Sequence, residues 1–250
     1  MSEAKPMGTP MQTGYLSTTN ESSDPLPNSV KYRQVIRSLL YIATVSRPDI
    51  ALAVGLLCRR VESPTEYDWK SVKRVLRYLA DTEEMKPYFS ARSKPVLQGY
   101  VDADWAGDKI DQKSSSGCLF QLGETVISWS TKKQTIVAVS STEAEYIAMA
   151  ETCKELLWLR QLLENLEIPQ TKAATMFQDN QRCIRLVESD RLNVRTMHIS
   201  VKYHLLKDLR EGNLLEVKYC QSHLMMADAL TKSMSKERLK RFLRHLRLAN

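Results

Sequence analysis

Apolar positions recur at helical spacing in the first third of the chain. They repeat every three or four residues from Val30 to Val45, and Ser46-Arg47-Pro48 interrupts the pattern. The proline of that break suits the first turn of a second helix, which continues through the apolar run Ile50–Cys58. A third helix begins at "SPTE", where we expect Ser63 to be the N-cap and Glu66 to complete a capping box.

From Lys94 onward the apolar spacing changes from helical to alternating. The segments "VLQGYVDA", "SGCLFQL" and "TVISWS" indicate strands, and Gly123-Glu124 predicts a tight turn between the last two. A long helix follows, with Thr142 and Glu145 expected as its capping box, and it ends near Asn165. The remaining pattern predicts a strand at "TMFQDN", a helix at "QRCIRLVES", a helix over His198 to Arg210, a strand at "LLEVKYC" and a helix beginning at "MMADALTKSM".

This order of elements predicts the architecture. Three consecutive strands followed by alternating helices and strands favour a mixed sheet with helices on its faces. The expected fold is therefore α/β, a five-stranded mixed sheet flanked by helices and preceded by a small helical segment. The expected boundaries are a disordered linker or tail over 1–29, the helical segment over 30–93, the sheet domain over 94–234 and a basic amphipathic helix over 235–250.

Composition and charge narrow the class of protein. The chain is 43% hydrophobic and 26% charged, as in ordinary globular proteins. No apolar run approaches the roughly 18 residues of a membrane span, and the N-terminus lacks the features of a signal peptide, so we expect no membrane partner. A net charge of +7 and a pI of about 9.1 favour a polyanionic partner such as nucleic acid. Five widely spaced cysteines without a Cys-x-x-Cys motif favour free, buried thiols in a reducing compartment.

Four acidic residues lie at the ends of predicted elements in the sheet domain. Asp102 ends the first strand, Glu145 lies in the first turn of the long helix, Asp179 ends the fourth strand, and Asp228 begins the helix after the last strand. Clustered carboxylates repel one another unless a cation lies between them, and Mg²⁺ binds through a few carboxylates plus substrate phosphate oxygens. Two such ions about 4 Å apart stabilise both the attacking and the leaving oxygen of phosphodiester cleavage. The pattern is therefore compatible with a metal-dependent site that cleaves phosphodiesters.

Each of these acids also has a purely structural interpretation. The alternatives are helix capping for Glu145, Asp179 and Asp228, and a turn position for Asp102. Asp104 lies two residues after Asp102, on the same face of the strand, and either supports the site or completes the following turn. Spacing alone leaves these alternatives open.

Eight ordered stretches carry a resemblance to a known family. They are "YRQVIRSLLYIATVSRPDIALAV", "SPTEYDWKSVKRVLRYL", "GYVDADWAGD", "KSSSGCLFQLG", "ISWSTKKQTIVAVSSTEAEYIAMAE", "KELLWLRQLLE", "QDNQRCIRL" and "MADALTK". Over roughly residues 32–232 the chain resembles the end of the Pol polyprotein of copia-type (Ty1/copia) LTR retrotransposons. In that family the second part is a ribonuclease H domain, and the part before it is the thumb-side end of reverse transcriptase.

The resemblance implies an activity, a set of ligands and a set of partners. The activity is a ribonuclease H that cleaves the RNA strand of RNA–DNA hybrids during reverse transcription. The family's catalytic, metal-binding carboxylates fall on Asp102, Glu145, Asp179 and Asp228, and they hold two Mg²⁺ or Mn²⁺ ions. The partners are the hybrid and the remainder of a reverse transcriptase. The expected location is intracellular, either cytoplasmic in a retroelement particle or nuclear.

Basic residues and one histidine are further candidates. Lys73 and Arg74 on the third helix are expected to contact phosphates, with a solvated basic face as the alternative. Lys132 and Lys133 after the third strand are also expected to contact phosphates. His223 precedes the last acid of the site by five residues. It is either an ordinary loop residue or an auxiliary group that assists product release.

The chain departs from the family pattern at three places. The family's "TKHID-x-R-YH" has become "TMHISVKYH", with Met197 and Ser200 in place of lysine and aspartate, which bears on substrate contact or local folding. The family's "STSGY" has become "SSSGC" at residues 114–118. The polymerase motif Tyr-x-Asp-Asp is absent, so we expect no DNA synthesis by this chain and interpret it as a fragment, a truncated copy or a domesticated remnant.

Two rival functions fit the same sequence. Integrases and transposases share this architecture with a three-acid site, but the order strand Asp, helix Glu, strand Asp, helix Asp favours ribonuclease H. The second rival is a catalytically silent module, derived from a retroelement, that binds nucleic acid or a polymerase partner. The presence of all four acids weighs against decay of the site.

Overall fold

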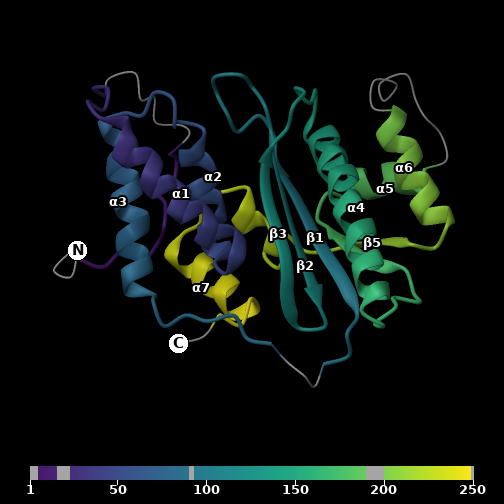
Figure 1. Cartoon of the computed structure of the whole chain (residues 1–250). Coiled ribbons are helices and arrows are strands. Elements are labelled where there is room, and N and C mark those ends of the chain that lie inside the picture. The colour runs from purple at the N-terminus through teal and green to yellow at the C-terminus, as the bar shows by residue number, and fades with distance from the viewer. Residues whose placement is uncertain (1–4, 16–22, 90–92, 190–199, 249–250) are drawn as a thin grey trace. The chain divides into compact units, whose positions relative to one another are not determined.

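The chain forms two compact units (Figure 1). The computed structural model describes residues 5–15, 23–89, 93–189 and 200–248. The first unit comprises Met1–Tyr88 together with Lys232–Asn250, and the second comprises Phe89–Thr231. The C-terminal segment therefore groups with the N-terminal helices, a long-range association that periodicity along the sequence does not reveal.

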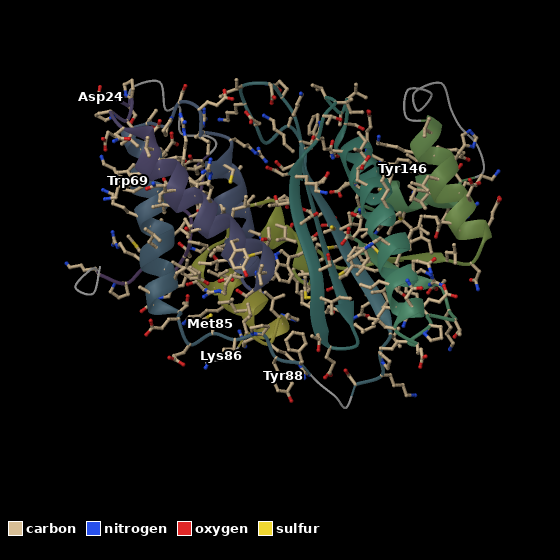
Figure 2. The ribbon with its side chains drawn as sticks, in the orientation of Figure 1. Asp24, Trp69, Met85, Lys86, Tyr88 and Tyr146 are labelled. Carbon is tan, nitrogen blue, oxygen red and sulfur yellow. The ribbon has the colours of Figure 1, made fainter. Side chains whose placement is uncertain are left out.

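The first unit is helical. The break expected at the proline of residue 48 is confirmed, because a short 3₁₀ helix separates the first two helices. Buried aliphatic side chains and Tyr32 line its core, and the Tyr32 ring lies 6.4 Å, centroid to centroid, from that of Trp69. Trp69 belongs to α3 and is labelled in Figure 2. Its elements are α1 (Ser29–Val45), η2 (Pro48–Ile50), α2 (Ala51–Cys58), α3 (Glu66–Asp81) and α7 (Lys236–His245).

The start of α3 differs from the prediction. Thr65 is the N-cap, and its hydroxyl accepts a hydrogen bond from the Asp68 N–H while Asp68 Oδ2 accepts one from the Thr65 N–H. The expected capping box of Ser63 and Glu66 is therefore wrong by two residues. Asp68 is fully buried and also accepts a hydrogen bond from Tyr15 at 2.5 Å. This tertiary contact favours the later of two overlapping capping patterns.

The described part of the N-terminal segment packs against α3. The Tyr15 ring stacks on Tyr67 with a centroid separation of 5.6 Å, and Met11 is buried. The guanidinium of Arg74 donates to the Thr9 carbonyl at 3.1 Å and to its hydroxyl at 2.7 Å. Residues 5–15, for which composition predicts a tail, are thus held by aromatic stacking and hydrogen bonds.

The second unit contains a five-stranded mixed sheet of order β3-β2-β1-β4-β5. The pairs β1/β2 and β2/β3 are antiparallel, and β1/β4 and β4/β5 are parallel. The predicted α/β fold with a mixed sheet and flanking helices is confirmed, as is the turn at Gly123, whose φ of +61° suits glycine. The strands are β1 (Leu97–Asp104), β2 (Ser115–Leu122), β3 (Thr125–Lys133), β4 (Ala174–Gln178) and β5 (Leu215–Tyr219).

Helices complete the second unit. The long helix α4 packs on β1 and β2, where Val101, Phe120, Met149 and Leu156 are buried in one core, which also contains Tyr146 (Figure 2). The 3₁₀ helix η4, predicted as the start of a helix, also contacts β1 and β2. The elements are α4 (Ser141–Asn165), α5 (Gln181–Glu188), α6 (Ser200–Glu211) and η4 (Met226–Leu230).

Of two further expectations, one falls on residues that the structure does not describe, and the other can be checked on the helices that it does describe. Residues 190–199, which include Met197, His198 and most of the altered "TMHIS" stretch, lie outside the described residues. Among the helices that the structure does describe, none has the length and apolar character needed to cross a membrane.

Candidate metal centre

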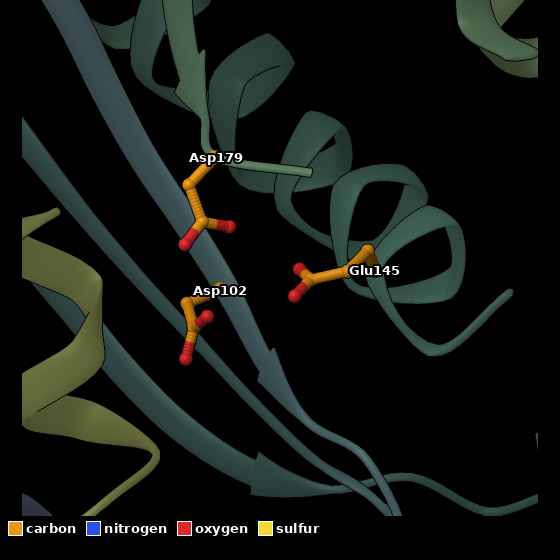
Figure 3. A group of neighbouring side chains, drawn as sticks. All are labelled: Asp102, Glu145 and Asp179. Carbon is orange, nitrogen blue, oxygen red and sulfur yellow. The ribbon is translucent and has the colours of Figure 1, made fainter. Parts of the chain in front are cut away.

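Three carboxylates converge at one edge of the sheet (Figure 3). Asp102, Glu145 and Asp179 each offer one carboxylate oxygen, and these oxygens all lie within 4.8 Å of one another. Asp102 and Glu145 are buried and Asp179 is half-buried. The structure thus brings together three of the four acids that the sequence analysis selected.

Strand pairing explains why the two aspartates meet. β1 and β4 are parallel neighbours, and Tyr100 pairs with Phe177 in their register. Asp102 and Asp179 each lie two residues beyond that pair, so both stand at the same level, at the carboxyl ends of adjacent strands. In open α/β sheets ligands bind outside this edge.

The start of α4 brings the third carboxylate to the same place. Ser140 is the N-cap, and its hydroxyl accepts a hydrogen bond from the Glu143 N–H at 3.2 Å. Glu143 Oε2 accepts from the Val139 N–H at 3.0 Å. The expected capping box of Thr142 and Glu145 is therefore wrong, because the helix begins two residues earlier. Glu145 has no part in this cap, and its carboxylate points toward the two aspartates (Figure 3).

Three neighbouring side chains donate hydrogen bonds to the carboxylates. The Thr231 hydroxyl donates to Asp102 Oδ2, Gln178 Nε2 donates to Glu145 Oε2 at 3.3 Å, and the Ser222 hydroxyl donates to Asp179 Oδ2 at 2.8 Å. Each carboxylate of the group therefore has a protein donor that restricts its orientation. None of these three donors is predictable from the sequence, since no spacing rule connects them to the acids that they contact.

The donor set of this group suits a hard divalent cation. Two unit negative charges 4.8 Å apart, the largest separation in this group, repel by about 3 kcal/mol at an effective dielectric constant of 20, and the attraction of a cation between them offsets that repulsion. Carboxylate oxygens are the ligands that Mg²⁺ and Mn²⁺ prefer. Burial raises the pKa of the nearby Cys183 thiol well above its usual value, and the negative charges of Glu145 and Asp179 raise it further. The group itself offers one carboxylate oxygen from each of its three residues.

The fourth predicted ligand, Asp228, lies outside the group of three. It is buried in η4, and its backbone carbonyl oxygen lies 3.3 Å from the Thr231 hydroxyl. The same hydroxyl donates to Asp102. One threonine therefore connects the segment that carries Asp228 to the first carboxylate of the site.

Asp104 also lies outside the group. A Cβ atom added at Gly107 would lie only 2.0 Å from Asp104 Oδ2, so the carboxylate occupies the space that glycine leaves open. Of the two alternatives for Asp104, this contact favours the turn position. A larger residue at position 107 would require the Asp104 side chain to move.

The predicted phosphate-binding residues divide into two kinds. Lys73 and Lys132 are exposed. Arg74 is bonded to Thr9, and burial, together with the positive charge of Arg77, lowers the pKa of its guanidinium. The first two cations are accessible to a ligand, whereas Arg74 already has a structural contact.

Lys133 likewise has structural partners. Its ammonium forms ion pairs with Asp108 at 2.5 Å and with Asp111 at 2.8 Å, both in the loop between β1 and β2. Burial raises the pKa of the Asp108 carboxyl, but the bonds from Lys133 and a backbone N–H outweigh it and lower that pKa overall. His223 is exposed and directly follows Ser222, the residue that donates to Asp179.

Comparisons with known proteins give a consistent set of relatives. A retrovirus-related Pol polyprotein from transposon TNT 1-94 of Nicotiana tabacum is 40% identical over 239 residues, 93% of this chain and 18% of that protein. One from transposon RE2 of Arabidopsis thaliana is 38% identical over 246 residues, 98% of this chain and 17% of that protein. The chain thus spans less than a fifth of the length of these two relatives. No protein-family model matches it.

A shorter relative and two solved structures complete the comparison. The secreted RxLR effector protein 161 of Plasmopara viticola is 44% identical over 131 residues, 52% of this chain and 92% of that protein. An N-terminal ribonuclease H domain from Mycobacterium tuberculosis, solved as a fusion protein, has a TM-score of 0.40 at 10% identity, over 59% of this chain and 96% of that one. A foamy viral protease-reverse transcriptase in complex with double-stranded DNA has a TM-score of 0.47 at 10% identity, over 85% of this chain and 35% of that one.

Proposed function

The chain belongs to the Pol polyproteins of copia-type LTR retrotransposons, and we propose that its second unit is a ribonuclease H that cleaves the RNA strand of RNA–DNA hybrids. The observation that carries the proposal is the group formed by Asp102, Glu145 and Asp179. Three carboxylates from a strand, a helix and a second strand meet at one edge of a mixed sheet. Such a group is unfavourable without a cation and suits divalent ions that act on phosphodiesters.

Asp102, Glu145 and Asp179 hold the cations in this proposal, and Asp228 from η4 is the fourth ligand. Two Mg²⁺ or Mn²⁺ ions, when bound, supply the Lewis acidity that activates water and stabilises the leaving 3′-oxygen, so that the products carry 5′-phosphates. Thr231 holds Asp102 through its hydroxyl, and Ser222 holds Asp179. These donors keep the carboxylates directed into the site before the substrate arrives.

The substrate in this proposal is a hybrid duplex bound mainly through its backbone. The net charge of +7 attracts a polyanion, and the exposed ammonium groups of Lys73 and Lys132 are the accessible cations among the predicted contacts. Selectivity for the RNA strand comes from its 2′-hydroxyls. In this proposal the exposed His223, next to Ser222, assists product release, and the remainder of a reverse transcriptase is the protein partner.

Cleavage of a labelled RNA–DNA hybrid in MgCl₂ tests the proposal. We expect the wild-type chain to release fragments with 5′-phosphates, and chelation by EDTA to stop the reaction. Asp102→Asn and Glu145→Gln each remove one ligand charge and should lower the cleavage rate by about 10²- to 10⁴-fold, since each weakens several kcal/mol of charge stabilisation. Single-stranded RNA and double-stranded DNA should remain intact.

Asp208→Asn is the matched control, because Asp208 is an exposed acid on α6 of the same unit. It changes the net charge as Asp102→Asn does, and it should leave the rate unchanged. Equal cleavage by the wild type and both site variants would overturn the catalytic proposal. Hybrid binding without cleavage by any of the proteins would favour a silent binding module instead.

A further inference from the structure

A buried glutamine at the end of β4 contacts two of the three residues of the metal centre. The Gln178 side chain is fully buried. Its Oε1 accepts hydrogen bonds from the backbone N–H of Asp179 at 2.8 Å and from that of Asn180 at 3.0 Å. Its Nε2 donates to Glu145 Oε2 at 3.3 Å. One amide therefore joins the turn that carries Asp179 to the carboxylate that comes from α4.

The surroundings determine which way this amide faces. Two backbone N–H groups are donors and require an acceptor, so the amide oxygen must face them. The opposite orientation would place the NH₂ group against both donors, and each unsatisfied buried donor costs about 1–3 kcal/mol. The NH₂ group therefore faces Glu145, a carboxylate, which can only accept when it is ionised. In the hydrogen bond between these two residues, Gln178 is therefore the donor and Glu145 is the acceptor.

We propose that Gln178 is a positioning residue of the cation site, an inference that rests on the proposed function. Its NH₂ group holds one oxygen of Glu145 and so keeps that carboxylate turned toward Asp102 and Asp179. Because the amide is neutral, it does this without adding to the negative charge of the site. Its oxygen accepts hydrogen bonds from the N–H groups of residues 179 and 180, so it also restrains the backbone that carries the Asp179 side chain.

A substitution that removes the amide but keeps the volume tests this role. Gln178→Met has no polar atom to hold Glu145, and partners of metal ligands typically contribute 10- to 100-fold to metal affinity. We expect Mg²⁺ to bind the variant at least about 10-fold more weakly than the wild type in calorimetric titrations without nucleic acid. Unchanged Mg²⁺ affinity in a folded Gln178→Met protein would overturn the proposal.

Two controls separate positioning from general damage. Asn180→Ala removes the N-cap bond to the Cys183 N–H and so disturbs the same turn, but it leaves the amide of Gln178 in place. Gln121→Met removes another buried strand glutamine, which accepts from Gln98 at 2.9 Å. Both should retain wild-type Mg²⁺ affinity. A loss in Asn180→Ala as large as in Gln178→Met would indicate that the turn, and not the contact with Glu145, is responsible.

Gln178→Glu keeps the proposal testable if the methionine variant does not fold. Glutamate still accepts from both N–H groups, but it places a second charge against Glu145. We expect the metal-free variant to unfold at lower urea concentration, with a smaller loss when Glu145→Gln is also present, because the repelling partner is then neutral. An equal loss in both backgrounds would overturn the contact. A wild-type chain that neither binds Mg²⁺ nor cuts hybrid would instead overturn the proposed function.

Discussion

The hydroxyl of Thr231 connects two parts of the proposed site. It donates to Asp102 Oδ2 and also lies 3.3 Å from the Asp228 carbonyl oxygen, in a side chain that is only 3% exposed. Hydrogen bonds to charged groups contribute about 1.5–3 kcal/mol, more than neutral ones. At the scale of single residues, this hydroxyl therefore restricts the direction of the Asp102 carboxylate.

Thr231→Val tests this contact, because valine keeps the shape of threonine and removes the hydroxyl. We expect a loss of about 1–3 kcal/mol in the free energy of unfolding, since the Asp102 carboxylate loses a buried donor. Urea unfolding in the absence of metal measures it. If the proposed function holds, hybrid cleavage in MgCl₂ should also fall by about 10-fold or more.

The matched control for that substitution is Thr175→Val. The Thr175 hydroxyl also donates to a carboxylate, that of Glu216 at 3.3 Å, but this pair is exposed and lies away from the three acids. We expect little change in stability, since exposed polar pairs contribute little. Equal effects of the two valine variants would show that the Thr231 hydroxyl does not support the site.

The acids of the site could be predicted from the sequence, whereas their hydrogen-bonding partners could not. Asp102, Glu145 and Asp179 lie near the ends of elements whose periodicity is clear, and elements meet at their ends. Gln178 and Thr231 contact these acids only because of rotamers and of chain segments far apart in sequence, which no spacing rule expresses. The catalytic roles of the acids remain predictions.

At the scale of elements, the start of α4 is ambiguous in the sequence, because two capping patterns overlap there. The sequence "SSTEAE" contains Ser140 followed three residues later by Glu143, and Thr142 followed three residues later by Glu145. Both pairs match the capping-box pattern. The structure uses the earlier pair, which leaves the Glu145 carboxylate available to the site. The α3 sequence "SPTEYD" presents the same ambiguity, and there the later pair is used.

Alanine substitutions at the two candidate caps distinguish these patterns. Ser140→Ala should lower the free energy of unfolding by about 1 kcal/mol, since the Glu143 N–H loses its acceptor. Thr142→Ala should have little effect, because this residue lies inside the helix and alanine is a good helix former. Thermal unfolding followed by circular dichroism measures both. A larger loss in Thr142→Ala would contradict the assignment of Ser140.

Element types were predictable for a physical reason, and element starts were not. A period of 3.6 or 2 extends over many residues, so α4 and β1 to β3 are recognisable without knowledge of their neighbours. Several neighbouring residues can each act as an N-cap, and tertiary contacts determine which of them does so. For α3 the buried bond from Tyr15 to Asp68 favours the later cap, and it comes from a segment 53 residues away in sequence.

At the scale of the whole molecule, the first unit has a buried ionic network of its own. The Arg47 guanidinium donates to both carboxylate oxygens of Asp49, at 2.9 and 2.8 Å, and the Tyr78 hydroxyl donates to Asp49 at 2.6 Å. Arg47 and Asp49 are each 5% exposed. The carboxylates of the candidate metal centre, in contrast, all belong to the second unit. Stability of the first unit and chemistry of the second can therefore be perturbed separately.

Asp49→Asn makes this separation measurable. The substitution leaves the buried Arg47 charge without its counterion, which typically costs about 3–5 kcal/mol. We expect amide hydrogen exchange to accelerate in α1, α2 and α3, while the amides of β1 and α4 retain their protection because their core contains none of the network. Glu84→Gln is the control, because it breaks an exposed ion pair with Lys86 in the same unit and should leave exchange unchanged. Equal acceleration across both units in Asp49→Asn would show that they unfold together as one cooperative body.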